Sequence, residues 1–198
     1  MRAHGKNAHR PRSLDEVVGG GLAAMTFALE PGAPFYIAHP AGALALTFME
    51  LVRDAGWKVH QILVWVKDSM VLGHADYHYK HEPILYGWTP GPGRSGRGDH
   101  EGSRWYGDNS QTSVFAVDRP KRNAEHPTMK PPELIAMMMR NSSRPGEVVI
   151  DCFSGSGSTL VAAEQTGRHG YGIELEPKYV AVAIERLAGM GLEPRLTE

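Results

Sequence analysis

The chain has 198 residues, of which 41% are hydrophobic and 22% charged, and its formal net charge is −1. This length suits one domain over residues 1–198, the composition excludes disorder throughout, and the near-zero charge excludes tight binding of nucleic acid by charge alone. The single cysteine, Cys152, excludes an intrachain disulfide, and no apolar run reaches the roughly 20 residues that cross a bilayer, so we expect a cytoplasmic protein without membrane association.

The first half of the chain alternates helical and strand-like segments. Residues 1–12 contain four basic residues and no acid, which predicts a flexible basic arm. Apolar spacing over residues 13–29 predicts a helix, although Gly19-Gly20-Gly21 in its interior weakens it. The segments that follow are expected to be a strand at 34–38, a helix at 44–55, and strands at 57–67 and 82–88.

The second half begins with a change of composition. Residues 89–125 open with TPGPGRSGRGDHEG and predict a loop-rich insertion with one short strand near 114–117. From residue 126 onward the pattern is regular, and the expected order is a helix starting at Pro131-Pro132, a strand at 147–150, a helix at 158–166, a strand at 171–175 and a helix at 177–187. Strands that alternate with helices of this length predict an α/β fold with a parallel sheet.

The turn DCFSGSG follows the strand at 147–150. Gly155 and Gly157 suit a turn that lets the backbone approach a ligand, and Glu174, about twenty residues on, suits the hydroxyls of a ribose. The alternative is an ordinary tight turn. Leu160 replaces the third glycine of a dinucleotide site, and no lysine near Gly157 makes a phosphate loop. A ligand with a ribose, a carboxylate, an amine and no phosphate is S-adenosyl-L-methionine, and Asp151 would suit its ammonium group.

The segment HPTMKPPELI at 126–135 strengthens this interpretation. Together with NSSRPGEVVIDCFSGSGSTLVAAE at 141–164, it resembles the beta-type DNA amino-methyltransferases, which methylate adenine N6 or cytosine N4. The resemblance implies a Rossmann-like methyltransferase fold with a permuted motif order and a mostly parallel sheet with an antiparallel edge strand. It also implies methyl transfer from S-adenosyl-L-methionine to an exocyclic amine in double-stranded DNA, with adenine N6 expected.

The resemblance assigns roles to individual residues. Phe153 would pack near the adenine of the cofactor, and Gly155 and Gly157 would let its methionine part approach. Glu174 would take the ribose, while Thr128 and Lys130 would hold the carboxylate. The alternatives are a plain helix cap for Thr128 and a solvated surface lysine for Lys130.

The catalytic signature of this family, Asp/Asn/Ser-Pro-Pro-aromatic, is not found in the sequence. We therefore assign no catalytic residue, and we expect the chain to lack the catalytic strand and to be inactive or nearly so alone. Alternatives are a non-catalytic fragment that binds cofactor or DNA, or half of a split enzyme. The expected protein partner is a second copy in a homodimer, or a complementing chain that carries the missing motif. A nicotinamide-dependent oxidoreductase is a third class, disfavoured by Leu160.

Three further features remain open. Positive and aromatic residues of the insertion suit DNA contact, and the candidates are Arg94, Arg104, Trp105, Lys121 and Arg122; a solvated loop is the alternative because nearby acids nearly cancel the charge. His74, Asp76, His78, His81 and Glu82 lie close in sequence but match no zinc spacing, so we predict no metal site and a substrate-facing loop. Cys152 is expected to be a small buried side chain rather than a reactive thiol.

Overall fold

The computed structural model describes residues 13–70, 72, 76–92, 104–119 and 129–197. The predicted basic arm at 1–12 lies outside these residues. The helices are η1 (Asp15–Gly19, a π-helix), α1 (Gly20–Ala28), α2 (Leu44–Asp54), α3 (Pro132–Ser142), α4 (Ser158–Gln165) and α5 (Pro177–Gly189). The strands are β1 (Pro34–Ala38), β2 (Lys58–Val66), β3 (His81–Trp88), β4 (Val114–Ala116), β5 (Val148–Asp151) and β6 (His169–Gly172).

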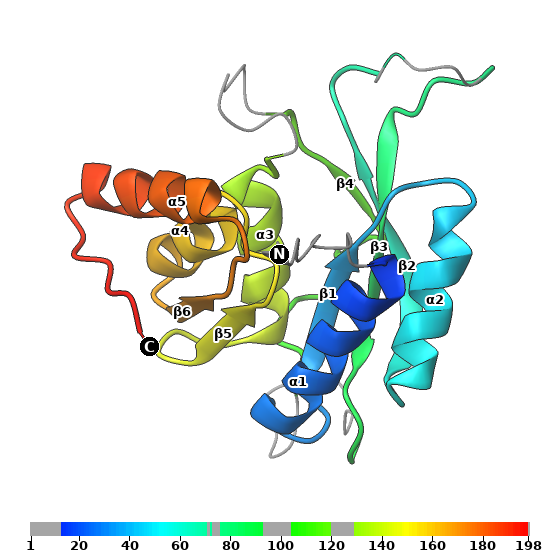
Figure 1. Ribbon diagram of the computed structural model, residues 1–198. Coiled ribbons are helices and arrows are strands. Elements are labelled where there is room, and N and C mark those ends of the chain that lie inside the picture. Colours follow the sequence, from blue (N-terminus) through cyan, green and yellow to red (C-terminus); the bar gives the residue numbers. More distant parts are fainter. Residues whose placement is uncertain (1–12, 71, 73–75, 93–103, 120–128, 198) are drawn as a thin grey trace, which may run out of the picture.

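Two sheets organise these elements (Figure 1). The first has the strand order β1-β3-β2-β4, and β3 runs antiparallel to β1 and β2, whereas β4 is parallel to β2. The second consists of the parallel pair β5-β6. All strands of the first sheet except β3 therefore share one direction, and the predicted α/β arrangement with mostly parallel strands is observed.

The antiparallel strand was expected at an edge of the sheet, and this placement is wrong. β3 lies inside the sheet, where Trp88 is paired with Pro34 of β1 on one side and with Lys58 of β2 on the other. The physical reason is burial on both faces, because the successive residues Ile84 and Leu85 point to opposite faces and are 1% and 0% exposed. A strand buried on both faces lies in the middle of a helix-covered sheet, where neighbouring strands pair its backbone along both edges.

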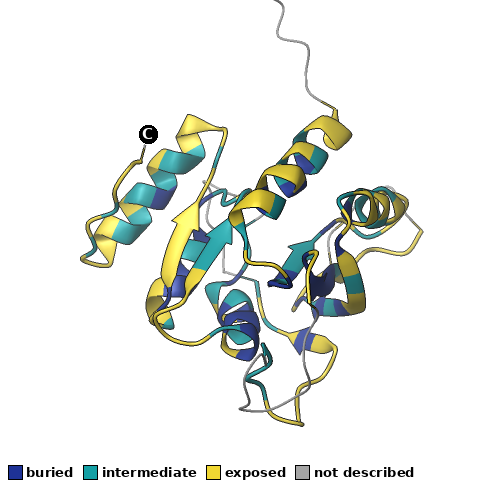
Figure 2. Ribbon diagram, turned by 90° about the horizontal axis from the view of Figure 1, so that it is seen from below, coloured by how far each residue is buried: buried dark blue, intermediate teal, exposed yellow. Residues whose placement is uncertain are grey.

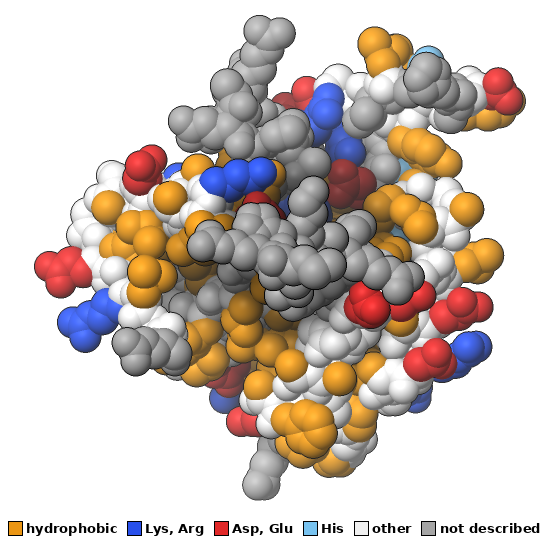
Figure 3. Space-filling view, in the orientation of Figure 1, with side chains coloured by type: hydrophobic (Ala, Val, Ile, Leu, Met, Phe, Trp, Pro, Cys, Tyr) orange, Lys and Arg blue, Asp and Glu red, His pale blue; other side chains and the backbone are white. Residues whose placement is uncertain are grey.

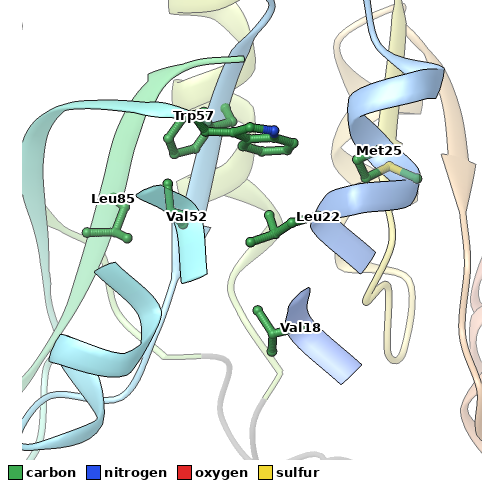
Figure 4. Close-up of a cluster of buried hydrophobic side chains, with 7 residues drawn as sticks. Val18, Leu22, Met25, Val52, Trp57 and Leu85 are labelled. Carbon is green, nitrogen blue, oxygen red and sulfur yellow. The ribbon is translucent and has the colours of Figure 1, made fainter. Parts of the chain in front are cut away.

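Helices cover both faces of the first sheet. On one face, α1 and α2 bury a cluster in which Leu22 of α1 points toward Val52 of α2 and toward Leu85, and Met25 of α1 belongs to the same cluster (Figure 4). On the other face, Leu134 and Met138 of α3 pack with residues of β2, β3 and β4. Each helix presents apolar residues three or four positions apart, which is the spacing of one helix face.

The glycine run in the first helix does not end it. Gly19, Gly20 and Gly21 are all helical, and a Cβ on Gly21 would lie 2.7 Å from the Phe153 ring. The absence of a side chain at Gly21 therefore lets α1 approach the turn after β5. The propensity penalty of glycine is offset here by tertiary packing.

The helices α1 and α3 also connect the two sheets. Ile150 and Cys152 pack against the α1 cluster, and Val149 packs against the cluster of α3 and α4. β1 and β5 are each the terminal strand of their own sheet, and no strand among the described residues pairs with the outer edge of either. Two unpaired strand edges are thus held between the same two helices.

One face of the β5-β6 sheet is open. Along β6 every residue is exposed, as Figure 2 shows, and Val148, Tyr171 and Ile173 are 63%, 54% and 48% exposed. In the space-filling view of Figure 3, apolar side chains gather over the part of the molecule that holds α5, β6 and α1 in Figure 1. The described residues therefore leave this apolar face uncovered.

The bounds of the remaining elements agree with the prediction within one to three residues, and β4 lies inside the loop-rich insertion where the short strand was expected. Within the described part of the chain, no helix is long and apolar enough to pass through a membrane.

Candidate functional site

The glycine turn connects β5 to α4. Gly155 and Gly157 have φ angles of +51° and +77°, a region that favours glycine because a Cβ would be strained there. The backbone N–H of Gly155 donates a hydrogen bond to Glu174 Oε2 at 2.8 Å. This contact is consistent with the sequence interpretation, in which the glycine turn and Glu174 belong to one site.

Glu174 lies just beyond β6 rather than in it. The strand was expected at 171–175, but it ends at Gly172 because its pairing partner β5 ends at Asp151. The other oxygen of Glu174 accepts a hydrogen bond from the backbone N–H of Glu176 at 2.9 Å. A carboxylate has about four acceptor positions, so two main-chain donors leave room for further donors.

The carboxylate of Asp151 also has protein partners. It accepts hydrogen bonds from the backbone N–H of Phe153 at 2.9 Å and from the hydroxyl of Thr159. Both partners belong to the turn and the first turn of α4, so Asp151 stabilises the turn. Its predicted contact with an ammonium group would use the acceptor positions that remain.

Side-chain packing explains why glycine stands at position 157 and leucine at position 160. A Cβ on Gly157 would lie 2.9 Å from the Cβ of Ala183 in α5. Leu160 stands where a dinucleotide site has its third glycine, and the glycines lie instead on β6, where a Cβ on Gly170 would come within 3.1 Å of Leu160. Gly157 is therefore required by the packing of α4 on α5, whatever ligand approaches the turn.

Phe153 is 47% exposed at the start of this turn. One part of its ring lies against Gly21 of α1, where a Cβ would come within 2.7 Å of the ring. The remaining aromatic surface is open to a ligand. This placement agrees with the predicted role of Phe153 beside an adenine, which stays a prediction.

Lys130 precedes α3 and is paired with Glu82 at the start of β3. Its Nζ atom lies 3.6 Å from Glu82 Oε2, while Nζ of Lys67 lies 2.6 Å from Glu82 Oε1. The Lys67 side chain is 7% exposed and that of Lys130 is 33% exposed. Lys130 is thus not a fully solvated surface lysine, and its ion pair with Glu82 is longer than that of Lys67. Thr128, its predicted partner, lies outside the described residues.

Arg186 of α5 is a contact of the turn that the sequence interpretation missed. Its Nη1 atom donates to the backbone oxygen of Ser156 at 2.7 Å and lies 3.3 Å from the Ser158 hydroxyl. Burial lowers the pKa of this guanidinium below its usual value. An arginine in a C-terminal amphipathic helix carries no sequence signal for such a contact, because the pairing depends on how α5 packs on α4.

Cys152 begins the turn and packs against the α1 cluster, where it is half-buried rather than fully buried as expected. Burial, followed by the nearby charge of Asp151, raises the pKa of this thiol to about 11. The thiol is therefore protonated at neutral pH, which fits the expectation of an unreactive side chain.

Two of the predicted DNA-contacting residues lie at the amino edge of the first sheet. Nη2 of Arg104 is 3.1 Å from Glu30 Oε2 and 3.3 Å from the backbone oxygen of Pro31, just before β1 begins. Trp105 lines a small pocket with Tyr36, Tyr86 and Asn141, near the end of α3. Lys130 precedes the start of α3, so this eleven-residue helix, about 16 Å long, separates the pocket from Lys130. DNA contact by Arg104 and Trp105 stays a prediction.

Other predicted residues lie beyond what the structure describes, namely Arg94, Lys121 and Arg122 of the insertion and His74 of the polar aromatic segment. Among the described residues no group of three or more His, Cys, Asp or Glu side chains is arranged to hold a metal ion. Asp76 and His78 are exposed, and Glu82 is paired with lysines.

Comparison with known proteins identifies the family. A family model described as DNA methylase, N6_N4_Mtase, matches residues 17–185. The type II methyltransferase M.XycI of Xanthomonas campestris pv. cyanopsidis is 32% identical over 149 residues, which are 70% of this chain and 47% of that protein. The chain thus spans about half the length of this curated relative.

Solved structures give the fold. The M1.HpyAVI–SAM complex superposes with a TM-score of 0.68 at 20% identity, covering 90% of this chain and 84% of that one. The cytosine-N4-specific PvuII DNA methyltransferase superposes with a TM-score of 0.67 at 16% identity, covering 95% of this chain and 77% of that one. The predicted Rossmann-like methyltransferase fold is confirmed, and the chain belongs to the N6_N4_Mtase family of DNA methylases.

Proposed function

We propose that this chain forms the cofactor-binding part of an enzyme that transfers a methyl group from S-adenosyl-L-methionine to an exocyclic amine of a base in double-stranded DNA. Family membership supports the reaction class. The observation that carries the cofactor assignment is the contact between Gly155 and Glu174, because it brings an acidic side chain and a glycine turn to the same edge of a parallel strand pair.

The chemistry of the donor set fits this cofactor. Glu174 keeps acceptor positions for the two ribose hydroxyls, and the half-exposed ring of Phe153 would pack on the adenine. Lys130 and Thr128 would hold the carboxylate, and Asp151 would accept from the ammonium group. The bound cofactor would supply an activated methyl group, and these residues would bind and orient it.

The target base is an adenine or a cytosine in this family, and we expect adenine N6. This preference comes from the sequence resemblance, and no described contact distinguishes the two bases. Digestion of a methylated duplex to nucleosides, followed by mass spectrometry, separates N6-methyladenine from N4-methylcytosine. A product containing only N4-methylcytosine would contradict the adenine expectation.

A group that activates the amine is not assigned among the 198 residues. The outer edges of β1 and β5, held between α1 and α3, would accept a further strand, since unpaired edges are templates for pairing. We infer that such a strand, supplied by a complementing chain, carries the catalytic signature. The chain alone would then bind cofactor but turn over slowly or not at all.

Calorimetric titration tests the proposal. The purified chain should bind S-adenosylhomocysteine and not NAD; binding of NAD alone would favour an oxidoreductase, and binding of neither would refute the cofactor site. A methylation assay with labelled cofactor and duplex DNA then tests activity. Turnover comparable to that of an intact relative would contradict the inferred need for a further strand. Cofactor binding without turnover is the result expected for the chain alone, whether it is half of a split enzyme or a non-catalytic fragment. The predicted cytoplasmic location stays a prediction.

A further inference from the structure

Two lysines share one carboxylate where β2 ends and β3 begins. Lys67 lies one residue after β2, and its Nζ atom is 2.6 Å from Glu82 Oε1. Lys130 approaches the other oxygen of the same carboxylate, with its Nζ atom 3.6 Å from Oε2. The three side chains together carry one net positive charge, so the group as a whole attracts an anion.

The backbone explains why Lys67 is fixed. Trp65 is paired with Glu82 across the sheet, and Lys67 follows Trp65 by two residues, so all three lie on the same face. The Lys67 Nζ atom lies 5.2 Å from the centroid of the Trp65 ring, and the Trp65 ring N–H donates to the backbone oxygen of Val117 at 2.7 Å. A buried aromatic ring thus supports the Lys67 side chain.

The two lysines differ in burial and in distance. Lys67 is 7% exposed, and a buried ammonium group is strongly destabilised without a partner. Lys130 is 33% exposed and lies 1.0 Å farther from its carboxylate oxygen, so its interaction with Glu82 is weaker. Glu82 is therefore directed mainly toward Lys67, and the charge of Lys130 is only partly compensated.

We propose that Lys67 is a positioning residue that engages Glu82, so that Lys130 remains available to an anionic group of the ligand. The inference rests on the proposed function, in which that group is the carboxylate of S-adenosyl-L-methionine. Without Lys67, Glu82 would pair closely with Lys130 and compete with the ligand carboxylate. Lys67 would then support binding without touching the ligand.

A purely structural role makes a different prediction. If Glu82 mainly tethered Lys130 in its binding position, removal of the Glu82 charge would weaken ligand binding. If Glu82 competes for Lys130, the same removal would leave binding unchanged or make it tighter. The substitution Glu82→Gln therefore separates the two.

The experiment compares two probes by calorimetry on the full 198-residue chain. S-adenosylhomocysteine carries the carboxylate, whereas 5′-methylthioadenosine keeps the adenine and ribose and lacks the amino-acid part. Because charge-assisted hydrogen bonds are strong, Lys130→Met should lower the affinity for S-adenosylhomocysteine about tenfold. Lys67→Met should lower this affinity about fivefold, since one charged interaction is lost indirectly. Neither substitution should change the affinity of 5′-methylthioadenosine.

The double variant Lys67→Met/Glu82→Gln is the decisive rescue. It removes the competing carboxylate together with Lys67, so affinity for S-adenosylhomocysteine should return to within about twofold of the unchanged chain. Failure of this rescue, or an equal loss for both probes in Lys67→Met, would overturn the proposal. Should Lys67→Met not fold, Glu82→Gln alone decides: retained affinity supports the proposal, and a loss confined to S-adenosylhomocysteine overturns it. If the unchanged chain binds neither probe, the proposed function itself fails.

Discussion

The backbone N–H of Gly155 donates a hydrogen bond to the carboxylate of Glu174 at 2.8 Å, which joins the turn after β5 to the segment after β6. The same carboxylate receives the N–H of Glu176 at 2.9 Å. Glu174 thus holds the turn in place and presents its remaining acceptor positions at the carboxyl edge of the strand pair.

Glu174→Gln should weaken binding of S-adenosylhomocysteine about tenfold or more, because hydrogen bonds to a charged group contribute about 1.5–3 kcal/mol. An amide keeps one acceptor oxygen but cannot accept from the turn and the ribose on both sides. Calorimetry measures the change. The matched control is Glu176→Gln, which removes a charge from an exposed side chain of the same segment and should have little effect. Equal losses in the two variants would contradict the specific role of Glu174.

Gly157→Ala should reduce the free energy of unfolding by about 2–5 kcal/mol, since it combines a left-handed backbone conformation with overpacking. The added Cβ would lie 2.9 Å from the Cβ of Ala183 at a φ of +77°. Urea denaturation followed by circular dichroism measures the loss. Gly146 provides the control, because its φ is +84° and a Cβ added there would meet no atom within 4 Å. Gly146→Ala should cost only about 1–2 kcal/mol. If the two losses were equal, the contact with Ala183 would be unimportant.

Alkylation of Cys152 should be slow at neutral pH and should accelerate only as the pH approaches 11. Burial is the main cause of the raised pKa, with the charge of Asp151 second, and the thiolate is the reacting form. Because folding favours the neutral thiol, this group contributes stability below its ordinary pKa of 9.0, and the contribution is lost as the pH rises toward about 11.

The rate of iodoacetamide labelling between pH 7 and 10 measures this effect. At pH 8 the thiolate fraction in the folded chain should be about 100-fold below that in the urea-unfolded chain, which serves as the control. A folded chain that labels as fast as the unfolded one would contradict burial of the thiol.

Arg119 and Arg104 test which edge of the first sheet faces DNA. Arg119 follows β4 at the carboxyl edge, where its backbone N–H donates to Asp68 at 3.1 Å and holds the pKa of that carboxyl below its usual value. Arg104 lies at the amino edge beside Glu30. If DNA lies across the edge that holds Lys130 and Glu174, Arg119→Ala should weaken duplex binding and lower the salt dependence by about one phosphate contact.

Fluorescence anisotropy with a labelled duplex, at several salt concentrations and with S-adenosylhomocysteine present, measures both quantities. Arg104→Ala is the matched control, because it removes the same charge from a residue that also pairs with a carboxylate, and it should leave the salt dependence unchanged. A reduced salt dependence in Arg104→Ala alone would instead support the DNA contact that the sequence predicted for the insertion.

The elements of the second half were predictable because each depends on local patterns. The apolar run of β5, the glycines of the turn and the helix start at Pro131-Pro132 specify backbone conformation within a few residues. The end of β6 was not predictable, since it depends on where the partner strand β5 ends. The interior position of β3 was missed for a related reason, because strand order follows from long-range pairing.

The sequence by itself determined the family, the glycine turn and the acidic residue that follows it. These features could be recognised because ligand binding requires particular residue types at fixed spacing along the chain. Only the tertiary structure decided which charged side chains contact one another or a distant backbone group. Lys67, Glu82 and Lys130 come from three segments separated by 15 and 48 residues, and Arg186 reaches Ser156 from another helix. Such contacts depend on packing between segments far apart in the sequence. The free energy of that packing cannot be predicted from local sequence patterns.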